Sequence, residues 1–328
     1  MTALTRRITL AAGTAFCCLA PALRRSVAQV WPDRPIRLFV GGAPGSVPDT
    51  LARVIAERLA MALNQPVIVE NKPGAAGSLA IGAMLAAKPD GHTLALATMS
   101  QAVFNSYLFP KLAYDPLQDF APVSLLATGA MAVAAHPAFP PTTFRAFVDL
   151  AKAQPGRIML GTTAVGSPPH VFCHLMLRAA GIKVTIVPHT SGAEGMRSVM
   201  RGDVQLFLDA PTIISPQVAA GAVKVLVVTG RSREKVLPDV PTIAEAGLPD
   251  ATAEAWIGLV ANAQTPPHLV ERLNASLTEL LALDSVRRRL EGLSFVATGS
   301  TPQEFAQSLR DDHGRWGPII TASGIKLE

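Results

Sequence analysis

The sequence predicts an α/β protein of two lobes, each a mostly parallel β-sheet flanked by helices, with a ligand cleft between the lobes. Short apolar or β-branched runs alternate with amphipathic stretches, which is typical of sheets covered by helices. No low-complexity linker or fixed-period repeat interrupts the 328 residues. Small polar residues follow most of the predicted strands, where α/β sheets bind ligands.

Strands are predicted where apolar and β-branched residues gather in short runs bounded by glycine, proline or polar residues. These runs are 36–40, 66–70, 93–99, 131–135, 158–162, 184–188, 204–209, 223–229 and 255–260.

Helices are predicted between the strands and after the last one. Apolar residues recur at helical spacing in 50–63, and 266–283 and 301–323 are predicted to be long helices. The last begins with the letters TPQE, a capping box with proline in the first turn. Helices that follow the last strand usually pack on an existing sheet, so we expect these two to complete the first lobe.

Strands that cross between two lobes would join them without a flexible tether. We expect crossings near 124–128 and 251–254. Lobe 1 then comprises residues 29–126 plus 252–328, and lobe 2 comprises 127–251.

Residues 1–28 are predicted to be a cleaved export signal. Arg6 and Arg7 precede an apolar run over 8–23, and Ser26-Val27-Ala28 matches the small-x-small cleavage pattern. We therefore expect cleavage near Ala28 and a periplasmic mature protein. The sequence does not decide between export by the general secretory pathway and export by the twin-arginine pathway.

The charge of the mature chain excludes nucleic acid as an expected partner. The whole chain carries a net charge of +5, but the predicted signal removes four arginines and no acidic residue, which leaves +1. Only Cys173 remains after cleavage, so no intrachain disulfide is expected. We expect a monomer.

The ligand site is predicted in loops that follow strands, where backbone amides and helix N-termini favour an anion. The first such loop, GGAPGSVPD, covers 41–49. Turn formation and helix capping explain the same residue types, with Asp49 as an N-cap. The candidate ligand-binding residues from these loops are Pro44, Gly45, Ser46, Val47, Asp49, Thr98, Ser100, Thr162, Thr163, Gly166, Ser167, His189 and Asp209.

Known nucleotide and catalytic motifs are missing from the sequence. Gly41, Gly42 and Gly45 lack the dinucleotide spacing, and no P-loop, nucleophile elbow or HExxH motif occurs. His170, Cys173 and His174 would share one helix face, but an amphipathic helix with a buried cysteine explains them equally. We expect no cofactor, no metal and no catalytic residue.

The sequence resembles the Bug receptors, which are the periplasmic solute-binding proteins of the tripartite tricarboxylate transporter family. The resemblance runs over essentially the whole mature chain, with the motifs in family order. They read WPDRPIRLFV, PGSVPDTLAR, PVIVENKPGAAG, KPDGHTLALAT, AYDPLQDFAPVSLLA, VPH, LPDVPTIAEAGLP and WGPIITASGIK.

This resemblance implies a Venus-flytrap fold that captures a small carboxylate and delivers it to two integral-membrane transporter subunits. It implies that loops 44–49 and 161–170 hold the carboxylate through amides, hydroxyls and ordered water, which adds His170 to the candidates. Two other functions stay open. The protein could be a sensor that feeds a signalling partner, or an exported α/β enzyme of hydrolase type that uses Asp209, His189 or Asp49 as acid or base.

Departures from the family pattern predict a less polar site. Val47 and Pro48 replace residues with hydroxyls, and His189 replaces a common tyrosine. Ala210 stands where asparagine often follows the aspartate, and Pro168-Pro169 replaces polar residues. We therefore expect a ligand with a carboxylate and an apolar or aromatic body rather than citrate.

Overall fold

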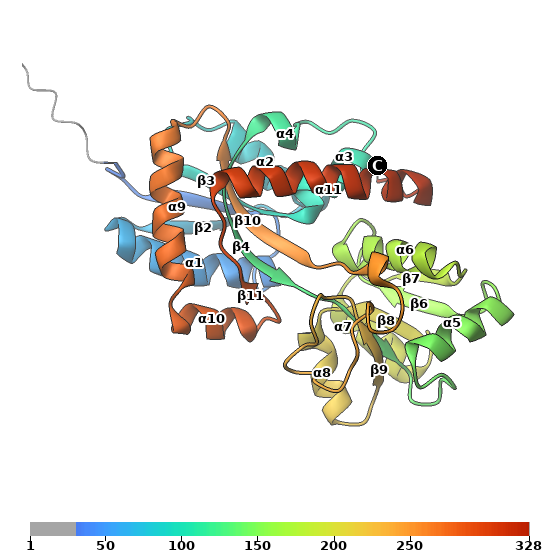
Figure 1. Cartoon of the computed structure of the whole chain (residues 1–328). Helices are drawn as coiled ribbons and strands as arrows, with labels where there is room; N and C mark the ends of the chain where they lie inside the picture. The colour runs from blue at the N-terminus through green and yellow to red at the C-terminus, as the bar shows by residue number, and fades with distance from the viewer. Residues whose placement is uncertain (1–30, 328) are drawn as a thin grey trace, which may run out of the picture.

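The computed structural model describes residues 31–327, so the predicted export signal lies outside the described residues. Two separate sheets form two lobes, one of six strands and one of five, each flanked by helices (Figure 1). This confirms the predicted two-lobed α/β fold.

The strands of the first sheet stand in the order β11-β4-β10-β3-β1-β2, and those of the second in the order β7-β6-β8-β5-β9. Their bounds are β1 Ile36–Val40, β2 Val67–Asn71, β3 Thr93–Thr98, β4 Phe120–Gly129, β5 Ala132–Ala135, β6 Met159–Thr162, β7 Thr185–Pro188, β8 Leu206–Asp209, β9 Lys224–Val228, β10 Ala255–Asn262 and β11 Val296–Ala297.

The helices cover both faces of the sheets. Their bounds are α1 Val47–Leu63, α2 Ser78–Leu85, α3 Asn105–Leu108, α4 Pro116–Asp119, α5 Phe144–Ala153, α6 Pro168–Ala180, α7 Gly192–Arg201, α8 Pro211–Ala219, α9 Pro267–Leu281, α10 Asp284–Glu291 and α11 Pro302–Ser323. Three further segments are short helical turns: η1 Ala75–Gly77, η2 Ser100–Phe104 and η3 Pro249–Ala251. Within residues 31–327, none of these helices is long and apolar enough to cross a membrane.

Most strands within each sheet share one direction. Parallel pairing joins β2, β1 and β3, whereas β10 pairs antiparallel with both β3 and β4. In the second sheet β7, β6 and β8 are parallel, and β5 is antiparallel to both of its neighbours. The carboxyl ends of the parallel strands therefore meet along one edge of each sheet, which is where α/β sheets bind ligands.

Local sequence patterns located most elements. Strand β1 and the C-terminal helix lie where the sequence predicts them, and the TPQE capping box forms between Thr301 and Glu304. Segment 124–128 was predicted to belong to a strand that crosses between the lobes, and in the structure it lies within β4, which pairs with β10 as far as Gly129. The second sheet begins with β5 at Ala132. The residue boundaries of the lobes stay predictions.

The two crossing segments meet at Thr229. Its hydroxyl accepts from the Met131 amide at 2.9 Å and donates to the Ala253 carbonyl at 2.7 Å. Its own amide and carbonyl also bond to Met131 and Ala253. Thr229 is 1% exposed, so these bonds form away from solvent and tie both crossings to the end of β9.

Helix α11 packs on the first lobe and also contacts the second (Figure 1). Its Trp316 stacks on Phe172 of α6 with ring centroids 5.0 Å apart and an angle of 14°. Both rings are almost fully buried. The apolar core therefore continues from one lobe into the other.

Candidate ligand-binding site

A cavity of about 730 Å³ lies between the lobes and is lined by residues of both. Lobe 1 contributes the loop after β1, the turn before α2 and the start of η2. Lobe 2 contributes the loop after β6, residue 190 and the end of β8. The cavity thus lies where the strand-end loops meet.

The structure brings part of the predicted site to this cavity. The candidates that line it are Ser46, Val47, Thr98, Ser100, Thr163, Gly166, Ser167 and Asp209. The candidates that do not line it are Pro44, Gly45, Asp49, Thr162, His170 and His189. Several residues of this second set instead make hydrogen bonds that hold the cavity-lining loops in place.

Asp49 holds the first loop together. Its carboxylate accepts from the Gly45 amide at 2.9 Å, from the Asn71 amide group at 2.9 Å and from the guanidinium of Arg53. Asn71 also donates to the Gly42 carbonyl. Burial would raise the pKa of Asp49, but these hydrogen bonds outweigh it and hold the pKa below its usual range.

Helix α1 therefore begins differently from the prediction. Its N-cap is Ser46, and Asp49 lies inside the first turn, so the interpretation of Asp49 as N-cap was wrong. The Gly45 amide is bonded to Asp49, and the Ser46 amide donates to Ala43. These two amides belong to the loop that was expected to bind the anion, but they already have partners within the loop.

The hydroxyl of Ser46 remains free for a ligand. It makes no capping bond to α1, and among the described residues it has no hydrogen-bond partner although it is buried. A buried hydroxyl without a partner carries an energetic cost that a bound polar group would remove. Ser46 also stands at the N-terminus of a 17-residue helix, where the dipole favours an anion.

In lobe 2, the loop before α6 supplies the opposite wall. Ser167 caps α6 and its hydroxyl lies 2.9 Å from that of Thr163. Gly166 adopts a φ of 79° and donates its amide to Nδ1 of His170 at 3.5 Å. Burial, helped by the nearby His174, lowers the pKa of His170 to about 4. A neutral His170 therefore acts as an acceptor that holds this loop.

Gln101 is a polar residue of the cavity that the sequence reasoning did not select. Its Oε1 accepts from the amide and the hydroxyl of Thr98, at 2.7 and 2.8 Å. Its Nε2 must then be the free donor, and it lies so close to Gly41 and Gly77 that a Cβ on either would collide with it. Glycine at both positions makes room for this amide beside the cavity.

Asp209 is the acidic residue that lines the cavity among the described residues. It is 6% exposed; its Oδ1 accepts from the Ala210 amide at 2.7 Å, whereas its buried Oδ2 has no partner in residues 31–327. Burial raises the pKa of Asp209 to about 6, although the Ala210 hydrogen bond opposes the shift. This carboxyl group can therefore carry a proton close to neutral pH.

His189 does not line the cavity, whereas the next residue, Thr190, does. The His189 amide and Nδ1 both lie within hydrogen-bond distance of the Thr162 carbonyl, at 2.8 and 3.2 Å. Thr190 lines the cavity instead, and its amide donates to Glu194. His189 thus links β7 to the loop after β6.

Apolar residues from several elements form the rest of the wall. They are Val47, Met131, Val165, Trp256, Ile257 and Phe295. No lysine or arginine lines the cavity in the described part of the chain. Sequence reasoning missed Trp256 and Phe295 because they come from β10 and from the segment before β11, far from the strand-end loops.

Comparison with known proteins agrees with this architecture. Two lobes with a cavity between them are typical of solute-binding receptors, although this fold alone does not fix the function. Residues 51–325 match the model of the tripartite tricarboxylate transporter family receptors. The chain belongs to this family.

Curated relatives cover nearly the whole chain. A UPF0065 protein from the TAR-I ttuE-ttuC′ intergenic region of Agrobacterium vitis is 33% identical over 297 residues, 90% of this chain and 86% of the relative. Protein BugT of Bordetella pertussis is 27% identical over 302 residues, 92% of this chain and 93% of BugT. These relatives confirm the predicted resemblance to Bug receptors.

Solved structures share the same fold. Rpa4515 of Rhodopseudomonas palustris, solved with adipate, superimposes with a TM-score of 0.79 at 29% identity, covering 90% of this chain and 99% of that one. MatC of the same organism, solved with bound malate, gives a TM-score of 0.76 at 33% identity, covering 88% and 100%.

Proposed function

We propose that this protein is a periplasmic receptor that captures a small organic acid in the cavity between its lobes and delivers it to a tripartite tricarboxylate-type transporter. The acid carries a carboxylate and an apolar body. The observation that supports this proposal most is an interlobe cavity that residues at the starts of α1 and α6 line, with no lysine or arginine among the described lining residues.

Helix N-termini supply the positive potential in this proposal. Residues at the starts of α1 in lobe 1 and α6 in lobe 2 line the cavity, and so does Ala210, the N-cap of α8. Each N-terminus presents the positive end of a helix dipole, but prolines in the first turns remove amide donors, above all in α6, which begins with Pro168 and Pro169. The Ser46 hydroxyl and the Gln101 Nε2 add two donors at the same cavity.

Asp209 has a specific role in this proposal. An ionised aspartate would repel a ligand carboxylate, whereas a protonated one can donate a hydrogen bond to it. The raised pKa of Asp209 allows the second state near neutral pH. We infer that the acid and Asp209 together carry one proton in the complex.

The apolar wall sets the class of ligand. Phe295 and Met131 are two large apolar residues that line the cavity, and Val47, Val165 and Ile257 add to the apolar wall. Relatives solved with adipate and malate indicate that small dicarboxylates are suitable probes. We expect adipate to bind more tightly than citrate, because citrate would place charged groups against these side chains.

A thermal-shift screen followed by calorimetry tests the proposal. The panel contains adipate, malate, citrate, benzoate and hexanoate, with the amide of adipate as the control that lacks the charge. We expect stabilisation by adipate, benzoate or hexanoate and none by the amide. Stabilisation by citrate alone would contradict the apolar assignment, and a product in mass spectrometry after incubation would contradict a receptor function.

A further inference from the structure

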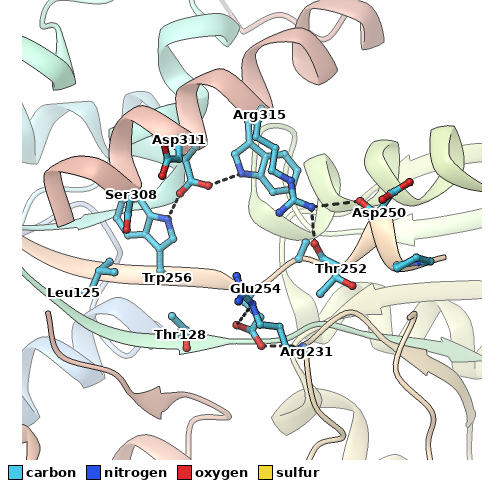
Figure 2. Close-up of a pocket in the computed structure, with 14 residues that line it drawn as sticks. Leu125, Thr128, Arg231, Asp250, Thr252, Glu254, Trp256, Ser308, Asp311 and Arg315 are labelled. Atoms are coloured by element: carbon cyan, nitrogen blue, oxygen red, sulfur yellow. Dashed lines mark hydrogen bonds and ion pairs between the residues drawn. The ribbon is translucent and has the colours of Figure 1, made fainter. Parts of the chain in front are cut away.

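Helix α11 turns different residues toward different neighbours. Ser308, Asp311 and Arg315 recur at helical spacing, and Figure 2 shows them beside a second cavity of about 770 Å³, between α11 and the segment that crosses to β10. His313 and Gly317, four residues apart, lie on another face of the helix. Helix α11 also packs against η2 and α3, the two segments that follow strand β3.

Segment η2 carries two of the polar residues that line the ligand cavity, Ser100 and Gln101. The Ser100 hydroxyl donates to the Gly166 carbonyl in lobe 2 at 3.2 Å. Gln101 is 4% exposed and keeps its Nε2 as a donor, because its Oε1 accepts from Thr98. A π-helical turn such as η2 is rare and often occurs at functional sites. The position of η2 therefore decides where the Gln101 donor lies relative to a ligand.

His313 of α11 binds the backbone of η2 directly after this donor. Its Nε2 lies 2.9 Å from the Ala102 carbonyl, and a carbonyl can only accept, so Nε2 carries the hydrogen. In the neutral ring Nδ1 is then an acceptor. The Tyr107 hydroxyl lies 3.1 Å from this Nδ1 and 3.0 Å from the His313 carbonyl, so two acceptors face its hydrogen. Tyr107 thereby favours the tautomer that donates to Ala102.

Gly317 permits the close approach of Tyr107 to α11. A Cβ at this position would lie 2.7 Å from Cζ of the Tyr107 ring and 2.9 Å from its hydroxyl oxygen, closer than a real Cβ comes. Gly317 is buried within α11, where glycine is less favourable than alanine. The contact with Tyr107, whose ring centroid lies 5.6 Å from that of His313, gives this glycine a structural reason.

A second contact from α11 supports the end of η2. The indole of Trp316 packs edge-on against Phe104, the last residue of η2, with centroids 5.5 Å apart and an angle of 70°. Both rings are almost fully buried. Packing therefore supports η2 at Phe104, and the hydrogen bond from His313 holds the part of the turn next to Gln101.

We propose that His313 is a positioning residue for ligand binding, which holds the backbone of η2 so that Nε2 of Gln101 meets the bound acid. His313 itself does not line the ligand cavity. It acts through the Ala102 carbonyl, and Tyr107 and Gly317 keep its ring in place. This inference rests on the proposed function, because it concerns the same cavity.

A double-mutant cycle tests this role. Calorimetry with adipate, benzoate and hexanoate gives the affinities of the wild type, His313→Leu, Gln101→Met and the double variant. His313→Leu removes the N–H donor and should lower the affinity by about fivefold, and by no more than Gln101→Met does. In the Gln101→Met background the same change should cost less than about twofold, because the donor that His313 positions is gone.

Conservative variants separate positioning from general support of the fold. His313→Gln keeps a terminal N–H donor and should stay within about twofold of the wild-type affinity. Tyr107→Phe keeps the ring against Gly317 but loses the hydroxyl, so it should shift the affinity in the same direction as His313→Leu and by less. Asp311→Asn is the matched control on α11. Its carboxylate accepts from Gln307 on the face beside the second cavity, so the variant should bind as the wild type does.

The possible results separate this inference from the proposed function. If the wild type binds but His313→Leu loses the same factor with and without Gln101→Met, His313 only supports the fold and the inference fails alone. If His313→Gln binds as weakly as His313→Leu, or if His313→Leu binds as the wild type does, the inference also fails. If His313→Leu does not fold, Tyr107→Phe takes its place in the cycle under the same criterion. If the wild type binds none of these acids, the proposed function fails, and the inference fails with it.

Discussion

Asp49 of lobe 1 and Asp209 of lobe 2 are both buried aspartates near the interlobe cavity, yet their surroundings differ. Donors from three residues satisfy the carboxylate of Asp49, which lies behind the loop it holds. Asp209 receives one short backbone hydrogen bond, keeps one oxygen without a partner and lines the cavity itself. The first aspartate builds the site, and the second is available to a ligand.

The two pKa shifts have opposite signs for this reason. Burial raises the pKa of any carboxyl group, and hydrogen bonds to the ionised form lower it. For Asp49 the hydrogen bonds prevail, whereas for Asp209 burial prevails. Asp209 is more deeply desolvated than Asp49 and also has fewer donors, and both differences give the two shifts their opposite signs.

The largest effect is expected from Asp49→Ala. This change leaves the Gly45 amide and the Asn71 side chain without their acceptor, and the loop over 41–45 loses its attachment to α1. We expect a loss of about 4 kcal/mol in the free energy of unfolding at pH 7, measured by urea denaturation. Asp49→Asn, which keeps one acceptor oxygen, is the control and should lose less. Equal stability of wild type and Asp49→Ala would refute the structural role.

Asp209→Asn should have the opposite effect on stability. The folded-state pKa of Asp209 lies above its unfolded value, so ionisation in the folded protein costs stability. This cost is absent below pH 4, grows as the pH rises from about 4 to about 6, and is complete above it. At pH 7 the variant should be more stable than the wild type by up to about 3 kcal/mol, and at pH 4 the difference should vanish. A difference that does not change with pH would contradict the raised pKa.

Gln101→Glu sharpens the comparison by placing a second carboxylate, besides that of Asp209, at the cavity. Glutamate keeps an oxygen for the Thr98 amide but replaces the Nε2 donor with a charged acceptor. We expect the affinity for adipate to fall by about 30-fold, close to 2 kcal/mol, in calorimetry at pH 7. Gln101→Met removes the donor without adding charge and should lose less. If Gln101→Glu bound adipate as the wild type does, Gln101 would not contact the ligand.

Ser46→Ala should have the smallest effect and should weaken only binding. The Ser46 hydroxyl makes no capping bond and is buried without a partner in the described residues, so its removal should leave the melting temperature unchanged or slightly raised, while the affinity falls by about fivefold, close to 1 kcal/mol. Ser167→Ala is the partner experiment, because Ser167 does cap α6 and bonds to Thr163. It should lower both stability and affinity. Loss of stability in Ser46→Ala would show a hidden structural role.

Local patterns explain which parts of the fold were predictable. β-Branched runs and capping residues influence structure only over a few neighbouring residues, so β1 and the start of α11 could be predicted from the local sequence. The extent of β4 beyond the predicted crossing at 124–128, and its pairing with β10, did not follow from the sequence, because that pairing joins segments more than 100 residues apart. Pairing over such distances depends on tertiary packing rather than on local propensity.

The candidate site was predictable only as a set of loops. Sequence reasoning placed Ser46 and Asp209 correctly near one cavity, because both follow predicted strands. It could not separate residues that line the cavity from those that hold the loops, such as Asp49 and His170, because that depends on side-chain direction. Gln101, which lies in one of these loops, was missed for the same reason, whereas Trp256 was missed because β10 lies outside them.

Proton uptake on ligand binding tests the central claim, that Asp209 shares a proton with the bound acid whereas Asp49 only supports the loop. Calorimetry at pH 7 in two buffers of different ionisation enthalpy, with the tightest-binding acid of the panel, gives the number of protons taken up. We predict uptake approaching one proton for the wild type and none for Asp209→Asn. Equal uptake in the two proteins, or none in the wild type, would contradict the claim.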